Sequence, residues 1–157
     1  MTFGLASIDI LGPDWNAVYL ASIIEGQYTV VLQPGADPVT GLTVGASISQ
    51  TALVPTDAQA IYFKAEALGF SVTLGGQNLS IIPLGTGTNY TLYGANIPGA
   101  DAGQIEPLTI TALAGPNTTD LFDSFLFSST PVPEPGVVGL SALGALVLGW
   151  RTLGRRR

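Results

Sequence analysis

The sequence predicts an all-β fold, an antiparallel β-sandwich or jelly roll, followed by a linker and one C-terminal transmembrane helix. About eight short apolar or alternating runs follow one another between residues 16 and 128, without a helical period longer than two turns, which predicts the sandwich. An uncharged apolar run from Val137 to Trp150, followed by arginines, predicts the helix. We therefore expect a sandwich over residues 1–128, a Pro-rich linker over 129–135, and a membrane helix with a basic tail over 136–157.

The first predicted strands end at turn residues. Residues 27–32 (QYTVVL) are rich in strand-forming residues and are followed by Gln33-Pro34-Gly35, a turn signal. A loop over 36–43 separates them from the next run, VGASISQTALV, at 44–54. In residues 60–66 (AIYFKAE), apolar residues alternate with Tyr62, Lys64 and Glu66, which is typical of a half-buried strand. Lys64, the only lysine, is therefore expected on the solvent face.

The later runs continue the alternation. In residues 70–74 (FSVTL), Phe70, Val72 and Leu74 alternate with hydroxyl residues. The turn residues 75–78 (GGQN) and the run 79–84 follow at once, so these two runs are expected to form a tight hairpin. Further strands are expected over residues 90–93, 108–113 and 121–128, the last of which is dense in aromatic residues.

Composition and charge exclude several functional classes. The residues before the tail include one lysine and ten acidic residues, which gives a net charge of −9. This part of the chain therefore cannot neutralise a row of nucleic-acid phosphates. Cysteine and histidine are both absent, which excludes disulfides, the common zinc sites and the Ser-His-Asp and Cys-His nucleophile systems. We therefore expect no nucleic-acid partner and no thiolate chemistry.

The acidic residues suggest turns rather than catalysis. Most lie beside Gly, Pro or Thr, as turn-forming Asp does, and no spacing pairs them as a glycosidase would require: Asp9, Asp14, Asp37, Asp57, Asp101, Asp120 and Asp123. We expect no enzymatic activity and no cofactor. A structural calcium ion held by Asp side chains and loop carbonyls stays open as an alternative, although no spaced Asp/Asn/Gly motif supports it.

The C-terminal run has the pattern of a membrane anchor. Its 14 uncharged residues rise about 21 Å as a helix, short of the ~30 Å hydrocarbon layer. The helix can still span if Arg151 extends its head to the interface. The basic cluster after the run is expected to stay in the cytoplasm, with the N-terminus outside; it consists of Arg151, Arg155, Arg156 and Arg157.

The tail as a whole resembles the PEP-CTERM sorting signal of Gram-negative surface proteins. Pro133-Glu134-Pro135, the apolar helix and the terminal arginines occur in the order of that signal. The resemblance implies recognition by an integral-membrane exosortase, processing near the Pro-Glu-Pro motif, and release toward the envelope or the exopolysaccharide matrix. The alternative is a plain transmembrane anchor whose prolines form a stiff spacer.

A second resemblance covers roughly residues 17–129. The runs GQYTVVLQPG, SISQTALVP, AQAIYFKA, FSVTLGGQNL, NYTLYGANI and LFDSFLF, in this order, are similar to the jelly-roll ectodomains found before PEP-CTERM tails, which are related to galactose-binding-like modules. In that family the last strand often has paired Asp followed by an aliphatic residue. Here the positions are Asp123-Ser124-Phe125, so the resemblance does not extend to the second Asp that would support a structural cation.

These observations predict a non-catalytic exported protein. It is expected to lie transiently in the inner membrane and then in the cell envelope or outside the cell. The first twenty residues have no basic region and contain Asp9 and Asp14, so no export signal is found in them, and we expect the native precursor to begin upstream of Met1.

A carbohydrate-binding module acting on exopolysaccharide is the alternative function. Trp15, Tyr19, Tyr62, Tyr90 and Tyr93 could stack on sugar rings, although packing in the sandwich explains most aromatics equally well. Of these, only Tyr62 is placed by its pattern on the polar face. No residue is assigned as a ligand.

Overall fold

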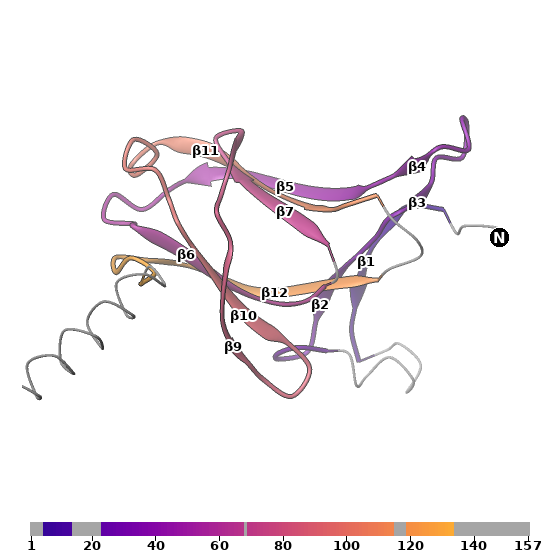
Figure 1. Ribbon diagram of the computed structural model, residues 1–157, viewed down its shortest axis with the longest axis horizontal. Coiled ribbons are helices and arrows are strands. Elements are labelled where there is room, and N and C mark those ends of the chain that lie inside the picture. The colour runs from indigo at the N-terminus through magenta and orange to yellow at the C-terminus, as the bar shows by residue number, and fades with distance from the viewer. Residues whose placement is uncertain (1–4, 14–22, 68, 115–118, 134–157) are drawn as a thin grey trace, which may run out of the picture.

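Antiparallel β-sheets make up the part of the chain that the structure describes (Figure 1). This computed structural model describes residues 5–13, 23–67, 69–114 and 119–133. Its strands are β1 (Ser7–Leu11), β2 (Thr29–Gln33), β3 (Gly35–Ala36), β4 (Thr43–Val44), β5 (Ala46–Leu53), β6 (Ala60–Glu66), β7 (Phe70–Leu74), β8 (Gln77–Asn78), β9 (Ile82–Thr86), β10 (Thr91–Asn96), β11 (Ile105–Ala112) and β12 (Asp120–Ser128). The predicted all-β antiparallel fold is confirmed, while the predicted C-terminal helix lies outside the described residues.

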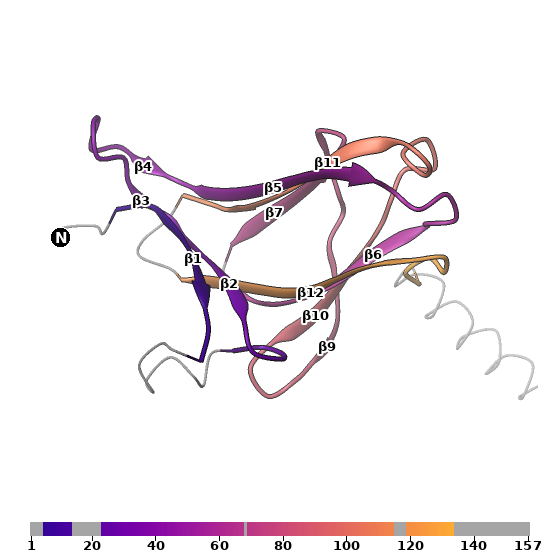
Figure 2. The same cartoon turned by 180° about the vertical axis from the view of Figure 1, so that it is seen from behind.

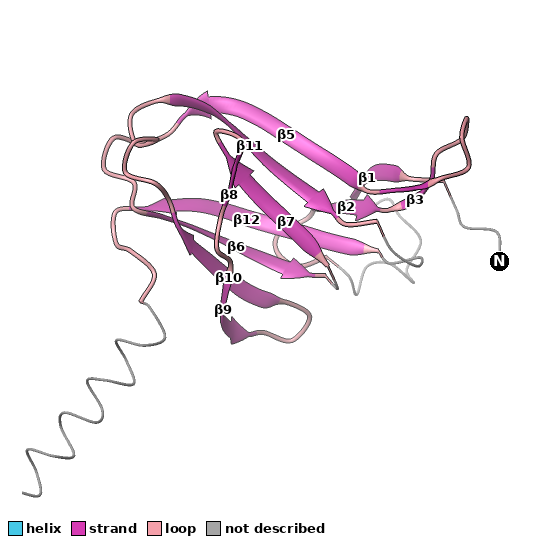
Figure 3. Cartoon of the chain, turned by 45° about the horizontal axis from the view of Figure 1, so that its top comes forward, coloured by secondary structure: helices cyan, strands magenta, loops and turns pink. Residues whose placement is uncertain are grey.

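Two main sheets face each other. One has six strands in the order β1-β2-β12-β6-β10-β9, and the other has four strands in the order β5-β11-β7-β8. The short pair β3-β4 extends beyond them at one end. In Figures 2 and 3 the four-stranded sheet lies as a layer over the six-stranded sheet, so the sheets form a sandwich-like arrangement.

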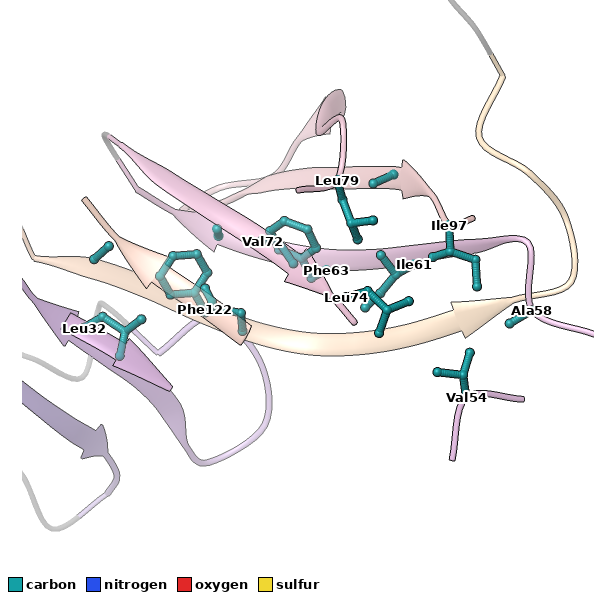
Figure 4. Close-up of a cluster of buried hydrophobic side chains, with 14 of the residues drawn as sticks. Leu32, Val54, Ala58, Ile61, Phe63, Val72, Leu74, Leu79, Ile97 and Phe122 are labelled. Carbon is teal, nitrogen blue, oxygen red and sulfur yellow. The ribbon is translucent and has the colours of Figure 1, made fainter. Parts of the chain in front are cut away.

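The core fills the space between the two sheets (Figure 4). Its buried side chains come from both layers, with Ile61, Phe63 and Phe122 on the six-stranded sheet and Val72 and Leu74 on the four-stranded one. This burial is the main stabilising contribution, because each large apolar side chain removed from water contributes roughly 1.5–3 kcal/mol.

Aromatic rings join the two layers at the centre of the core. Phe63 is fully buried and stacks on Tyr93 and Phe125, with ring centroids 5.6 and 5.1 Å apart. The ring of Phe70, from the opposite sheet, is nearly perpendicular to the rings of Phe63 and Phe122, with ring centroids 5.7 and 5.4 Å apart. These offset and edge-on arrangements are the favoured ones for aromatic pairs, so the rings fix how one sheet sits on the other.

Period-2 patterns identify the strands and their buried faces correctly. The buried side chains of β6, Ile61, Phe63 and Ala65, are those that the alternation predicts, and Lys64 lies on the outer face. The alternation is confirmed in β7 and β11 as well. The predicted strands over 27–32, 44–54 and 121–128 are found as β2, β5 and β12 with shifted ends.

Two expectations need correction, and one strand was not predicted. The tight turn after β7 exists, with Gly75 and Gly76 both at positive φ, but its return strand is only the two residues of β8. The chain then crosses to the six-stranded sheet, where Pro83 suits the edge strand β9, because proline cannot donate to a second ladder. The loop predicted over 36–43 includes the ends of the β3-β4 pair. Strand β1 was not predicted, and its Ile8 and Ile10 are exposed.

Candidate functional site

A β-bulge in β12 organises the outer face of the six-stranded sheet. The pairing with β6 shifts between Asp123 and Leu126, so two residues of β12 lie opposite one residue of β6. Ser124 at the bulge has φ of 56°, the only non-glycine residue with positive φ among those described. This conformation is strained for a residue with a side chain, and such strain is often found at functional positions.

At this bulge, Asp123 accepts hydrogen bonds from a segment that is distant in the sequence. Its Oδ2 accepts hydrogen bonds from Thr29 Oγ1 at 2.9 Å and from the backbone N–H of Glu25 at 3.2 Å. Its Oδ1 accepts from the backbone N–H of Ser124 at 2.6 Å. Thr29 Oγ1 also accepts from the N–H of Ile24 at 2.9 Å, so the segment before β2 is tied to the bulge of β12.

Lys64 and Glu25 form an ion pair beside the bulge. Lys64 Nζ lies 2.8 Å from Glu25 Oε2, and Ser124 Oγ donates to the same carboxylate oxygen. The hydrogen bond from Lys64, and then that from Ser124, hold the pKa of Glu25 below its ordinary value of 4.5. The same hydrogen bond raises the pKa of Lys64. Both groups are therefore charged at neutral pH.

The ammonium group of Lys64 is the cation of this acidic cluster. Asp123 and Lys64 are opposite each other in the β6–β12 ladder, and Glu25 reaches the same ammonium from the loop. Among the described residues, no group of three or more acidic side chains could hold a metal ion. Ser124 Oγ donates a hydrogen bond to Glu25 and adds no carboxylate to the cluster.

A polar hollow of about 500 Å³ lies next to Lys64, at the loop between β9 and β10. The ring of Tyr90 joins the two features, because it lines the hollow and its centroid lies 4.9 Å from Lys64 Nζ, within cation–π range. The amide of Asn89 donates to the carbonyl of Ile23 at 2.9 Å and so fixes the wall of the hollow. The rest of the lining combines hydroxyl, carboxylate and aromatic groups, mainly Glu66, Thr86, Thr88, Thr91, Tyr93 and Thr119.

The chain after β12 is fixed to the sandwich at Val132. The backbone N–H of Val132 donates to Asn96 Oδ1 at 2.6 Å, and the Asn96 amide donates to the Val132 carbonyl at 3.2 Å. The Val132 side chain is only 2% exposed and lies over Gly94, where a Cβ would come within 2.8 Å of Val132 Cγ2. Residue 94 must therefore be glycine for Val132 to pack in this way.

The structure describes one residue of the predicted sorting motif. Pro133 is exposed and follows the fixed Val132 directly. Glu134, Pro135, Arg151, Arg155, Arg156 and Arg157 lie outside the described residues, as does the predicted helix over 136–157. No helix among the described residues is long and apolar enough to cross a membrane.

The aromatic side chains divide between the core and the surface. Tyr93 packs in the core against Phe63, as the packing alternative expected, and Tyr62 is half-buried on the outer face close to Val132. Tyr90 lies by the hollow, and Trp15 and Tyr19 are outside the described residues.

Two features of the site were not expected from the sequence. One is the bulge, for which Asp-Ser between aromatic residues was an available signal, since the spacing from Phe122 to Phe125 breaks the alternation. The other is the fixed Val132, which a Pro-Val-Pro segment does not reveal. Comparisons with models of known protein families, with curated proteins and with solved structures found no match to this chain.

Proposed function

We propose that this chain is a non-catalytic exported protein, sorted through a PEP-CTERM signal and processed by an exosortase. The proposal includes a jelly-roll ectodomain of the galactose-binding-like kind, a transient stay in the inner membrane through residues 136–157, and a final place in the cell envelope or extracellular matrix. Its main support is the order of Pro133-Glu134-Pro135, apolar run and arginines in the sequence.

The fixed Val132 is the structural observation that supports it most directly. Val132 is held by Asn96 directly before the motif, and Pro133, the first residue of the motif, is exposed. A processing enzyme needs its target as an extended segment outside the folded domain. Proline on both sides of Glu134 favours such an extended backbone.

Replacing the motif tests this proposal. Pro133, Glu134 and Pro135 are changed together to alanine in the native host, and the protein is followed by cell fractionation and intact-mass measurement. We expect the variant to stay full-length in the inner membrane, while the parent appears as a shorter form in the envelope or medium. Pro131→Ala, an exposed proline in the same segment outside the motif, is the control and should be processed like the parent. If the triple variant were processed like the parent, the tail would be an ordinary membrane anchor rather than a sorting signal.

The polar hollow favours carbohydrate binding as the second candidate function. Sugar rings bind to sites that combine an aromatic face with several hydroxyl and carboxylate groups, and the hollow offers Tyr90, Glu66 and four threonines. No catalytic pair is needed for binding alone. The ligand would be an exopolysaccharide of the matrix to which sorting delivers the protein.

A pull-down with purified exopolysaccharide tests this second function. The full chain in mild detergent is compared with Glu66→Gln, which changes the wall of the hollow, and with Glu106→Gln, which removes one acidic charge from the opposite sheet. We expect binding that Glu66→Gln weakens and Glu106→Gln leaves unchanged. If no binding were seen at millimolar sugar, only the structural role would remain.

A further inference from the structure

The polar hollow at the loop between β9 and β10 is lined by a single charged side chain, that of Glu66, among the described residues. Its volume of about 500 Å³ lies within the roughly 300–1,000 Å³ that is typical of small-ligand sites. The other side chains of the lining are uncharged and belong to alanine, threonine, asparagine and tyrosine residues. The charge of Glu66 therefore decides which ligands the hollow attracts.

The carboxylate of Glu66 is available to a ligand. Glu66 is exposed at the end of β6, where its ladder partner on β12 is Leu121. Within the part of the chain that the structure describes, this carboxylate forms no ion pair, because the only basic residue there, Lys64, is bonded to Glu25. A cationic group of a ligand would give Glu66 its partner.

The one ammonium group near the hollow is already engaged. Lys64 Nζ lies 2.8 Å from Glu25 Oε2 and 4.9 Å from the centroid of the Tyr90 ring. Asp123 is opposite Lys64 in the β6–β12 ladder, so a second carboxylate accompanies the same ammonium. Together with Glu66, three carboxylates share this region with one ammonium, which leaves it negative. An acidic sugar would therefore meet like charges without a free cation to bind it.

The charge of the described chain as a whole acts in the same direction. It carries nine acidic side chains and one lysine, and such an imbalance attracts cations toward the surface. An amino sugar offers an ammonium group for a charge-assisted hydrogen bond to a carboxylate, and hydroxyl groups for neighbouring hydroxyls. The lining of the hollow supplies four threonine hydroxyls beside Glu66, from Thr86, Thr88, Thr91 and Thr119.

We infer that the ligand of the hollow is a polysaccharide with free, protonated amino groups, which Glu66 binds as their counter-ion. The inference rests on the carbohydrate-binding candidate proposed above, and it narrows the ligand from exopolysaccharide in general to a cationic amino-sugar polymer. N-acetylation removes the charge of the sugar amine, and a uronic acid reverses it. Neither of these sugars can form the ion pair with Glu66.

Calorimetric titration of the full chain in mild neutral detergent tests this ligand class. The probes are oligomers of equal length made of glucosamine, of N-acetylglucosamine and of galacturonic acid. A pH of about 5.5 protonates the sugar amines and lies above the ordinary glutamate pKa of about 4.3. We expect the parent to bind the glucosamine oligomer about fivefold more tightly than the acetylated one, as an exposed ion pair would allow, and to bind the galacturonic acid oligomer least.

Variants of Glu66 assign the preference to the hollow. Glu66→Gln should bring the affinities for the glucosamine and acetylated oligomers together, and Glu66→Lys should favour the galacturonic acid oligomer. Glu106→Gln and Glu106→Lys make the same changes of charge on the opposite sheet and should keep the preference of the parent. If these controls changed the preference as much as the Glu66 variants do, it would come from net charge, and the assignment to Glu66 would be overturned.

The outcomes separate this inference from the carbohydrate-binding candidate. If the parent bound the glucosamine and acetylated oligomers equally, or preferred galacturonic acid, carbohydrate binding would stand and the amino-sugar inference would be overturned. If none of the oligomers bound, both would be overturned.

Discussion

The two sheets differ in how their outer faces are stabilised. On the six-stranded sheet, Lys64, Glu25, Asp123 and Ser124 form a charged network around a strained bulge. On the four-stranded sheet, uncharged hydroxyl groups of β5 and β11 pair across the ladder, as in Ser49 with Thr109. The first network depends on residues far apart in the sequence, while the second follows from strand register alone.

This difference separates a specific site from a general surface. The charged network joins the loop before β2 to β12 and borders the polar hollow through Tyr90. Each member has several partners, so loss of one disturbs the others. The hydroxyl pairs are exposed and independent of one another, and water replaces them at little cost in free energy. We therefore expect function on one face and tolerance on the other.

The largest effect is expected where the two sheets meet. Phe63→Ala removes a fully buried ring that contacts Phe70, Tyr93 and Phe125. It should lower the free energy of unfolding by about 3–5 kcal/mol, because the cavity adds to the lost burial. Denaturant unfolding measures this loss. A change below about 1 kcal/mol would mean that the sheets do not depend on this ring cluster.

The next effect sharpens the comparison at the bulge. Ser124→Ala and Ser124→Gly both remove the hydroxyl that donates to Glu25, but only glycine adopts positive φ without strain. The glycine variant should therefore be more stable than the alanine variant by about 1 kcal/mol. Chemical unfolding of the two variants under the same conditions checks this. A more stable alanine variant would contradict the left-handed conformation at residue 124.

How much of this could be predicted from the sequence differs between the two faces. The alternation in LTITAL and FSVTL predicts the outward hydroxyl groups of β11 and β7, because a strand side-chain period of two needs only local information. The charged network could not be predicted in the same way. Lys64 was expected on the outer face, but Glu25 reaches it from a loop whose path depends on Thr29 and Asp123.

The bulge and the end of the domain show the same limit. In LFDSFLF the alternation breaks after Phe122, and only the pairing of β12 with both β2 and β6 decides where the extra residue goes. Val132 lies in a segment expected to be a linker. Its burial depends on Gly94 and Asn96, which are distant in the sequence. Local pattern predicts strands and their faces, whereas contacts between distant segments require the fold.

A smaller effect concerns the pH dependence of the charged network. The pKa of Glu25 is lowered in the folded state, so its ion pair contributes stability above pH 4.5, and this contribution is lost as the pH falls through the lowered pKa. Lys64→Met should therefore make the loss of stability below pH 4.5 less steep. Thermal unfolding across pH 2 to 7, as an assay range, measures it. In a Glu25→Gln background, Lys64→Met should have no further effect on the slope of stability against pH. If it did change that slope, the pH dependence would originate in other acidic residues.

The smallest effect is expected on the four-stranded sheet and tests the tolerance of its outer face. Thr109→Val removes the hydroxyl that bonds Ser49 while keeping a β-branched side chain of similar shape. The lost hydrogen bond is exposed, and valine favours strands at least as well as threonine, so the free energy of unfolding should change by less than about 0.5 kcal/mol. Ser49→Ala removes the same bond from the partner side, together with the exposed 3.3 Å contact of Ser49 Oγ with the Leu108 carbonyl, and should also have a small effect. If either change cost more than about 1 kcal/mol, the hydroxyl pairs would be acting as a coupled network, and the contrast between the two faces would no longer hold.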